Sequence, residues 1–215
     1  QLHKRLDKVR LQRHERRRAR DRTGAATVSL VGYTNAGKST LFNRLTGAEV
    51  FAADQLFATL DPTLRRIDLP DCGPVILADT VGFIRHLPHS LVAAFRATLE
   101  ESRVAKLLLH VIDAREHERG ERIDQVNAVL KEIDAEQVPQ IEVYNKIDLL
   151  NGHSSRVDRD AEGRIQRVWV SAANGAGLEV LRAAMAERIH HMAVGETGRP
   201  ILSKRIRRRL FLTAG

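Results

Sequence analysis

The sequence predicts an α/β fold, with a mostly parallel sheet of about six strands and helices on both faces. Short apolar runs alternate with longer helical patterns, which is the order expected when helices connect parallel strands. The polar motifs directly follow the apolar runs, so we expect the chemistry in loops at one edge of the sheet. With 215 residues, 43% of them hydrophobic, the chain can form one domain of ordinary size with appendages.

The individual elements follow from the apolar runs and the helical patterns between them. The run from Leu107 to Ile112 is apolar except for His110, which suits a central strand buried on both faces. We interpret His110 as a core histidine rather than a metal ligand. Residues 65–68 alternate poorly, as an edge strand can. We expect strands at 27–32, 64–69, 75–79, 107–113, 141–145 and 167–171, and helices at 38–46, 91–104, 118–135 and 177–192.

The first motif has the pattern G-x-x-x-x-G-K-S and lies between an apolar run and a helix start. Backbone N–H groups of such a loop and of the helix N-terminus favour anionic oxygens. Lys38 can reach the β- and γ-phosphates of a nucleotide, and the Ser39 hydroxyl can ligate magnesium. The motif predicts a P-loop NTPase, whereas the alternative is a chance match in a turn. The phosphate-binding candidates are Gly32, Tyr33, Thr34, Asn35, Ala36, Gly37, Lys38, Ser39 and Thr40.

The second motif is Asp79-Thr80-Val81-Gly82, a D-x-x-G that closes the apolar run 75–78. An acid at a strand's carboxyl end can hold magnesium through water. The amide of Gly82 can bond the γ-phosphate because no side chain blocks its approach. Alone, D-x-x-G usually marks only a turn, but its place after the phosphate loop and two further strand-like runs favours a nucleotide site.

The third motif is Asn145-Lys146-Ile147-Asp148, N-K-x-D, at the end of another strand-like run. The Asp148 carboxylate only accepts hydrogen bonds, and guanine offers N1–H and its 2-amino group as paired donors. Adenine offers no such pair, so a site of this kind can reject it by roughly four orders of magnitude. Asn145 can brace the loop, and the Lys146 stem can lie against the base. The alternative is a turn with one exposed lysine.

Two weaker elements complete the pattern. Ser171, Ala172 and Ala173 follow a short strand and can place backbone amides against guanine O6. The segment 54–63 has little periodicity and lies where a sensor of the γ-phosphate belongs. A threonine there can give its hydroxyl to magnesium and its amide to the γ-phosphate, so loss of the phosphate would release the loop. Thr59 and Thr63 both qualify.

These motifs, in this order, are typical of the translation-factor-related GTPases. The sequence resembles the HflX family of ribosome-binding GTPases over roughly residues 1 to 192, and the resemblance rests on segments 32–43, 53–63 and 78–88. In that family the magnesium-ligating threonine stands in F-A-T-L-D, which implies Thr59 within the nucleotide-binding residues Phe57, Ala58, Thr59, Leu60 and Asp61. Lys38, Thr59 and Gly82 would then be the catalytic residues, and Ser39, Thr59 and Asp79 the magnesium ligands.

The resemblance also implies the ligands and the partner. GTP and GDP would be bound with Mg²⁺, and the ribosome, chiefly the large subunit and its RNA, would be the partner. The implied role is to split or rescue stalled ribosomes.

Two residues bear on the mechanism. Phe83 stands where Ras-like GTPases carry a glutamine that orients the attacking water. A phenyl ring cannot do that, so we expect slow hydrolysis unless a partner assists. Asn35 is an asparagine that similar GTPases use to help hold K⁺ against the phosphates, and the alternative is that it merely suits an irregular turn.

Charge divides the chain into three parts. Residues 1–22 carry a net charge of +7 and residues 199–209 of +6, which leaves −5 for residues 23–198 of the total +8. We expect a basic linker helix over 1–22, the end of a helical hairpin in the family. A GTPase domain over 23–192 follows, and a basic segment over 193–215 would begin a truncated domain. The chain begins at Gln1, so we expect a piece of a longer protein.

The charged ends leave two other functions open. They suit RNA, so GTP could merely gate an RNA-binding module, and they also suit anionic lipids, as in a membrane-surface switch. No lipidation motif supports the second, and no apolar run approaches ~18 residues, so no membrane span is predicted. The single cysteine, Cys72, is expected in a hairpin turn and favours a reducing interior. We expect a cytoplasmic, monomeric protein.

Overall fold

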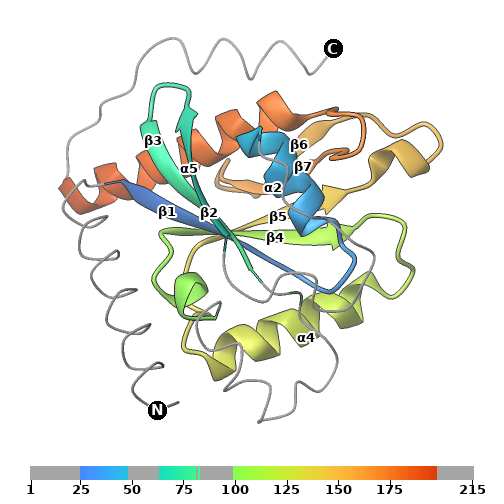
Figure 1. Ribbon diagram of the computed structural model, residues 1–215, viewed down its shortest axis with the longest axis horizontal. Helices are drawn as coiled ribbons and strands as arrows, with labels where there is room; N and C mark the ends of the chain where they lie inside the picture. The colour runs from blue at the N-terminus through green and yellow to red at the C-terminus, as the bar shows by residue number, and fades with distance from the viewer. Residues whose placement is uncertain (1–24, 48–62, 81, 83–98, 198–215) are drawn as a thin grey trace, which may run out of the picture.

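The computed structural model describes residues 25–47, 63–80, 82 and 99–197, which form one twisted sheet with helices on both faces (Figure 1). The sheet has seven strands in the order β2-β3-β1-β4-β5-β7-β6. The strands are β1 (Ala26–Val31), β2 (Thr63–Leu69), β3 (Gly73–Asp79), β4 (Leu107–Asp113), β5 (Gln140–Asn145), β6 (Arg156–Arg159) and β7 (Ile165–Trp169). The inner strands pair in parallel and only β2 and β6 pair antiparallel, so the predicted fold class is confirmed.

The predicted number of strands was one too low, because β6 was missed. Its sequence, Arg-Val-Asp-Arg, has no apolar alternation, and the strand is held by contacts with β7 instead. The Arg156 guanidinium lies 3.9 Å from the centre of the Trp169 ring, and Trp169 Nε1 donates to Asp158 at 2.7 Å. Cross-strand pairs of this kind stabilise a sheet edge that composition alone does not predict.

The helices lie close to their expected places. Helix α2 (Lys38–Thr46) follows β1, and α4 (Arg119–Glu132) follows β4. Helix α5 (Leu178–Thr197) follows β7 and is the last described element, and it extends past its expected end at 192. A short 3-10 helix, η1 (Ile147–Leu149), follows β5. Of the helix expected over 91–104, residues 99–103 are helical and 91–98 lie outside the described residues, as does the basic helix expected over 1–22. No helix within the described ranges is long and apolar enough to span a membrane.

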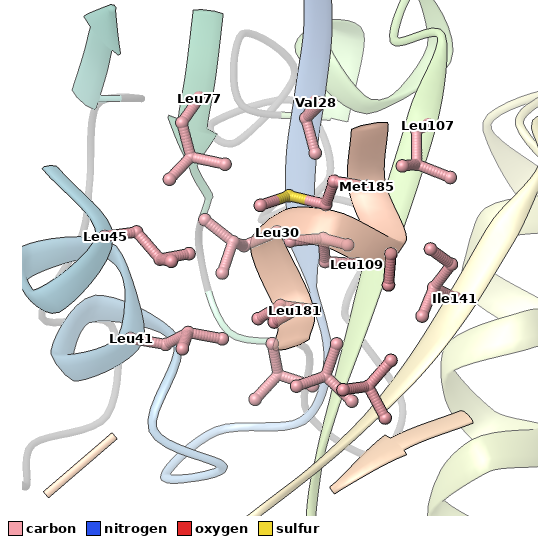
Figure 2. Packing of buried hydrophobic residues seen from close by; sticks show 14 of the residues in the cluster. Val28, Leu30, Leu41, Leu45, Leu77, Leu107, Leu109, Ile141, Leu181 and Met185 are labelled. Atoms are coloured by element: carbon pink, nitrogen blue, oxygen red, sulfur yellow. The ribbon is translucent and has the colours of Figure 1, made fainter. Parts of the chain in front are cut away.

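Strand β4 supplies side chains to both faces of the sheet, as its apolar run predicted. Leu107 and Leu109 pack into a cluster with side chains from α2 and α5, among them Leu41 and Leu181. Figure 2 shows this cluster around Val28 and Leu30 of β1. Leu108 points to the other face, where it joins residues of α4 in a second cluster. The alternation of one central strand therefore positions the helices on both sides.

His110 and Cys72 also take the predicted structural places. His110 is buried, at 2% exposure, and its pKa is lowered to about 4 by burial and then by the nearby charge of Lys38, against a hydrogen bond with Gln140. The imidazole is therefore neutral at physiological pH. Cys72 lies in the turn between β2 and β3, where burial raises the pKa of its thiol and makes the thiolate scarce.

Truncation of a β4 side chain should test this packing. We expect Leu109→Ala to lower the free energy of unfolding by about 2–5 kcal/mol, because Leu109 is fully buried and the helices cannot close the cavity. Urea denaturation followed by circular dichroism measures the change. Leu149→Ala is the control, since Leu149 is 55% exposed and should cost about 0.5 kcal/mol or less. Equal losses in the two variants would contradict the assignment of the core.

Candidate functional site

The loops that carry the sequence motifs meet at one edge of the sheet. Strands β1, β3, β4, β5 and β7 are parallel, so their carboxyl ends lie on the same edge. The loop between β1 and α2, residue Asp79 at the end of β3, and the segments that follow β5 and β7 all start from that edge. In open parallel sheets this edge is where ligands bind.

The phosphate loop leaves no space for side chains at two of its glycines. Gly32 has a φ of +146°, and a Cβ added there would lie 2.2 Å from the carbonyl oxygen of Val111. Gly37 has a φ of +93°, and its added Cβ would lie 2.3 Å from Nδ2 of Asn145. Asn35, with a φ of 59°, also adopts the left-handed conformation and has an exposed side chain. Both readings of Asn35, turn former and ion ligand, fit this geometry.

Lys38 is the buried cation of the loop. It is 6% exposed, and its Nζ donates to the carbonyl oxygen of Tyr33 at 2.9 Å. Burial lowers its pKa to about 8, and the opposite charge of Asp79 offsets part of that effect. An ammonium group that is poorly solvated gains more from an approaching anion than one in water does. Thr40, two residues on, has an exposed side chain.

Ser39 and Asp79 present oxygen atoms to the same point. Ser39 Oγ donates to Asp79 Oδ2 at 2.7 Å, which joins the first turn of α2 to the last residue of β3. A hydroxyl and a carboxylate are the hard oxygen donors that Mg²⁺ prefers, so these residues fit a magnesium site. Thr80 has a structural contact instead: its buried hydroxyl donates to the carbonyl oxygen of Leu30 in β1 at 2.5 Å.

Gly82 lies against the phosphate loop. A Cβ added to Gly82 would lie 3.0 Å from Lys38 Nζ and 2.9 Å from Cγ2 of Thr34. Any side chain larger than hydrogen would therefore press on the lysine. The structure thus places the second motif next to the first, as the proposed shared contact with a γ-phosphate requires.

The N-K-x-D segment is held by hydrogen bonds to two other loops. Asn145, 2% exposed, donates from Nδ2 to the carbonyl oxygen of Ala36 at 3.0 Å and accepts at Oδ1 from the amide of Ala172 at 2.9 Å. Lys146 Nζ donates to the carbonyl oxygen of Asn35 at 2.7 Å and to Asp113 Oδ2 at 2.8 Å. These two hydrogen bonds hold the ammonium group in place. The aliphatic stem of Lys146 therefore forms a stable surface beside the loop.

Ser171 orients the acid that would recognise guanine. Its hydroxyl donates to Asp148 Oδ1 at 2.5 Å and accepts from the amide of Asn174 at 3.2 Å. Asp148 Oδ2 is not part of that bond. The carboxylate therefore has a defined direction, which paired hydrogen bonds to a base require.

Some predicted residues cannot be placed. Phe57, Ala58, Thr59, Leu60, Asp61, Val81 and Phe83 lie outside the described residues. Thr63, the alternative to Thr59, begins β2 and pairs with Asp79 in the antiparallel ladder.

Sequence reasoning missed two residues that touch the site. Asp113 binds Lys146, and hydrogen bonds from Arg115 and Lys146 lower the pKa of its carboxyl despite partial burial. Its position at the carboxyl end of a strand could have identified it. Arg44 in α2 donates to backbone carbonyls of the loop after β7. Nothing in the local sequence signals that contact.

A comparison with protein families decides the assignment. Residues 27–146, more than half of the chain, match the model of the 50S ribosome-binding GTPases. This chain belongs to that family. Within the family it is similar to GTPase HflX of Escherichia coli K12, with 57% identity over 212 residues, which are 98% of this chain and 50% of that protein. The resemblance to HflX is thereby confirmed, and the chain spans about half the length of its HflX relative.

Solved structures that are similar to this chain agree on the fold. A GTP-binding protein from Sulfolobus solfataricus in complex with GDP matches with a TM-score of 0.60 and 27% identity, over 86% of this chain and 61% of that one. Era in complex with MgGDPNP and a 16S ribosomal RNA segment matches with a TM-score of 0.59 and 25% identity, over 76% of this chain and 56% of that one. The P-loop GTPase fold is therefore confirmed for this family member.

The lowered pKa of Lys38 predicts that this family member takes up protons on binding a nucleotide. Near pH 8 about half of the buried amines are neutral, and bound phosphates would favour the charged form. We expect an uptake of roughly half a proton at pH 8 that shrinks toward zero at pH 7. Calorimetric titration with GDP in buffers of different ionisation enthalpy measures the uptake. Equal heats in all buffers at pH 8 would contradict the burial of the free amine.

Proposed function

We propose that this chain is the GTP-hydrolysing switch domain of a ribosome-binding protein. The observation that carries the proposal is the meeting of two half-sites at one sheet edge. A phosphate loop with a buried cation stands at one end, and an oriented carboxylate stands at the other. Asn145 ties the two together. Family membership supports the same activity.

The phosphates would be held by the loop Gly32 to Ser39. Its amides and the start of α2 favour anionic oxygens, and Lys38 supplies the charge that the β- and γ-phosphates need. Ser39, Asp79 and Thr59 would hold magnesium, which supplies further positive charge to the same phosphates. The fit of Ser39 and Asp79 supports this set, and Thr59 rests on the family resemblance.

The base would be recognised at the other end of the site. Asp148 accepts hydrogen bonds from N1–H and the 2-amino group of guanine, while Lys146 covers one side of the ring. The Ser171–Ala173 loop would supply a backbone amide to O6. Since adenine cannot satisfy the carboxylate, GTP is the expected nucleotide.

Hydrolysis would proceed slowly in the absence of a partner. Lys38 and the Gly82 amide stabilise charge on the γ-phosphate, but Phe83 provides no polar group to orient the attacking water. A partner, the backbone or a bound cation must supply that function. Asn35 makes K⁺ the cation to test.

The partner that we propose is the ribosome, chiefly its large subunit and the RNA in it. The family description names 50S ribosome binding, which supports the large subunit. Era, a structural neighbour, is bound to a segment of 16S ribosomal RNA, which supports contact with ribosomal RNA but not the choice of subunit. On this proposal the domain over 23–192 is the switch, and the basic segments 1–22 and 193–215 lead to further domains of a monomeric, cytoplasmic protein. Its role would be to split or rescue stalled ribosomes.

The charge of the two ends favours a second candidate, an RNA-binding module in which GTP only gates affinity. The two candidates differ in turnover. A switch enzyme should hydrolyse GTP faster when its partner is present, whereas a gated module should bind RNA without faster hydrolysis.

Measurement of GTP turnover with and without purified large ribosomal subunits tests the proposal. We expect stimulation of roughly a hundredfold or more, on the order of what a positioned catalytic group contributes. The experiment is run in K⁺ and in Na⁺ buffer, and faster turnover in K⁺ alone would support an ion role for Asn35. Bound GTP with no stimulation would favour the gated module or docking through other domains.

Replacement of the base-recognising acid tests the guanine assignment. We expect Asp148→Asn to weaken GTP binding by roughly a hundredfold or more, because the amide lacks one acceptor, and to improve binding of xanthosine triphosphate. Competition against a fluorescent guanine nucleotide measures both affinities. The conservative control Asp158→Asn alters an acid of β6 and should change neither. Unchanged GTP affinity in Asp148→Asn would disprove the assignment.

A further inference from the structure

Arg44 connects the phosphate-binding helix to the loop after β7. It lies in the last turn of α2, and its Nε donates to the carbonyl oxygen of Ala172 at 3.1 Å. Its Nη2 donates to the carbonyl oxygen of Ala173, the next residue. The two carbonyls are 128 and 129 residues away in sequence, so the contact exists only in the folded domain.

The two carbonyls control the direction of the neighbouring amides. A peptide unit is planar, and in the trans form its C=O and N–H groups point in opposite directions. When Arg44 holds the carbonyl of Ala172, the N–H of Ala173 in the same plane points away from α2. When it holds the carbonyl of Ala173, the N–H of Asn174 points away as well, and this N–H donates to Ser171 Oγ at 3.2 Å.

The other amides of this loop already have partners. The Ser171 amide donates to the carbonyl oxygen of Ala176 at 2.9 Å, and the Ala172 amide donates to Asn145 Oδ1 at 2.9 Å. Among the described residues, the Ala173 amide has no such bond. It is therefore the group of this loop that is available to an incoming carbonyl oxygen.

We propose that Arg44 is a positioning residue for guanine recognition, which aims the Ala173 amide at O6 of the base. The inference rests on the proposed function, since it needs a guanine nucleotide in the site. It assigns to α2 a second task besides presenting the phosphate loop. The alternative is that Arg44 only complements the negative end of the helix dipole, a role open to any cation in a last turn.

Nucleotides that differ only in the base distinguish the two roles. GDP and inosine diphosphate both carry O6, whereas 2-aminopurine riboside diphosphate lacks it. We expect Arg44→Met to weaken the binding of GDP and of inosine diphosphate by the same factor. This factor is about tenfold, which is typical for one net hydrogen bond. The affinity for the 2-aminopurine nucleotide should change by less than about twofold, because this base has no oxygen for the Ala173 amide to bind.

Two further variants control the measurement. Arg182→Met removes hydrogen bonds to the carbonyl oxygens of Leu45 and Asp68, so it also affects the end of α2 but leaves the Ala172–Ala173 loop untouched. It should keep the affinity for all three nucleotides. Arg44→Lys keeps the positive charge and can reach one carbonyl, so an intermediate loss of GDP affinity is expected. Thermal denaturation checks that each variant is folded. If Arg44→Met does not fold, the nucleotide affinities are compared between the wild type and Arg44→Lys alone.

The outcomes separate this inference from the function on which it rests. Equal losses for all three nucleotides, or full GDP affinity in Arg44→Met, would overturn the role of Arg44. A complete rescue by Arg44→Lys would do the same, since charge at the helix end would then suffice. A wild-type chain that does not bind GDP would overturn the proposed function instead.

Discussion

The buried amide of Asn145 is the contact on which the site depends. One side chain joins the loop after β1, through Ala36, to the loop after β7, through Ala172. Gly37 has no space for a Cβ because Asn145 Nδ2 is there, so the two positions constrain each other. A buried donor or acceptor that loses its partner costs about 1–3 kcal/mol. The phosphate end and the base end are therefore expected to move together.

A second constraint is electrostatic. Lys38 is almost completely buried, and Asp79 offsets only part of the desolvation that lowers its pKa. The positive charge of Lys38 also lowers the pKa of His110 and so helps to keep that imidazole neutral within the sheet. The domain thus carries a cation that its own structure solvates poorly. An anion that reaches the loop would replace part of the missing solvation, which would favour the binding of phosphate.

The features that sequence predicted are those encoded locally. The continuous apolar run identified β4 as the central strand, and the phosphate-loop motif predicted the strand before it, β1, and the helix after it, α2. The features that it missed depend on partners far along the chain. Strand β6 is held by Trp169, and Arg44 contacts Ala172 only after the sheet has formed. Asp113 is intermediate, because its strand was predicted but its bond to Lys146 requires two strands to be adjacent.

The place of β1 in the sheet bears on how the protein is made. This strand is early in the chain, yet its partners are β3 on one side and β4 on the other. Gly32 at its end needs the backbone of Val111, which belongs to β4. A growing chain therefore cannot shape its phosphate loop until β4 has left the ribosomal exit tunnel. Such non-local pairing slows folding and leaves apolar strands exposed during synthesis. Nascent forms of this domain should accordingly be substrates for chaperones before they can bind any nucleotide.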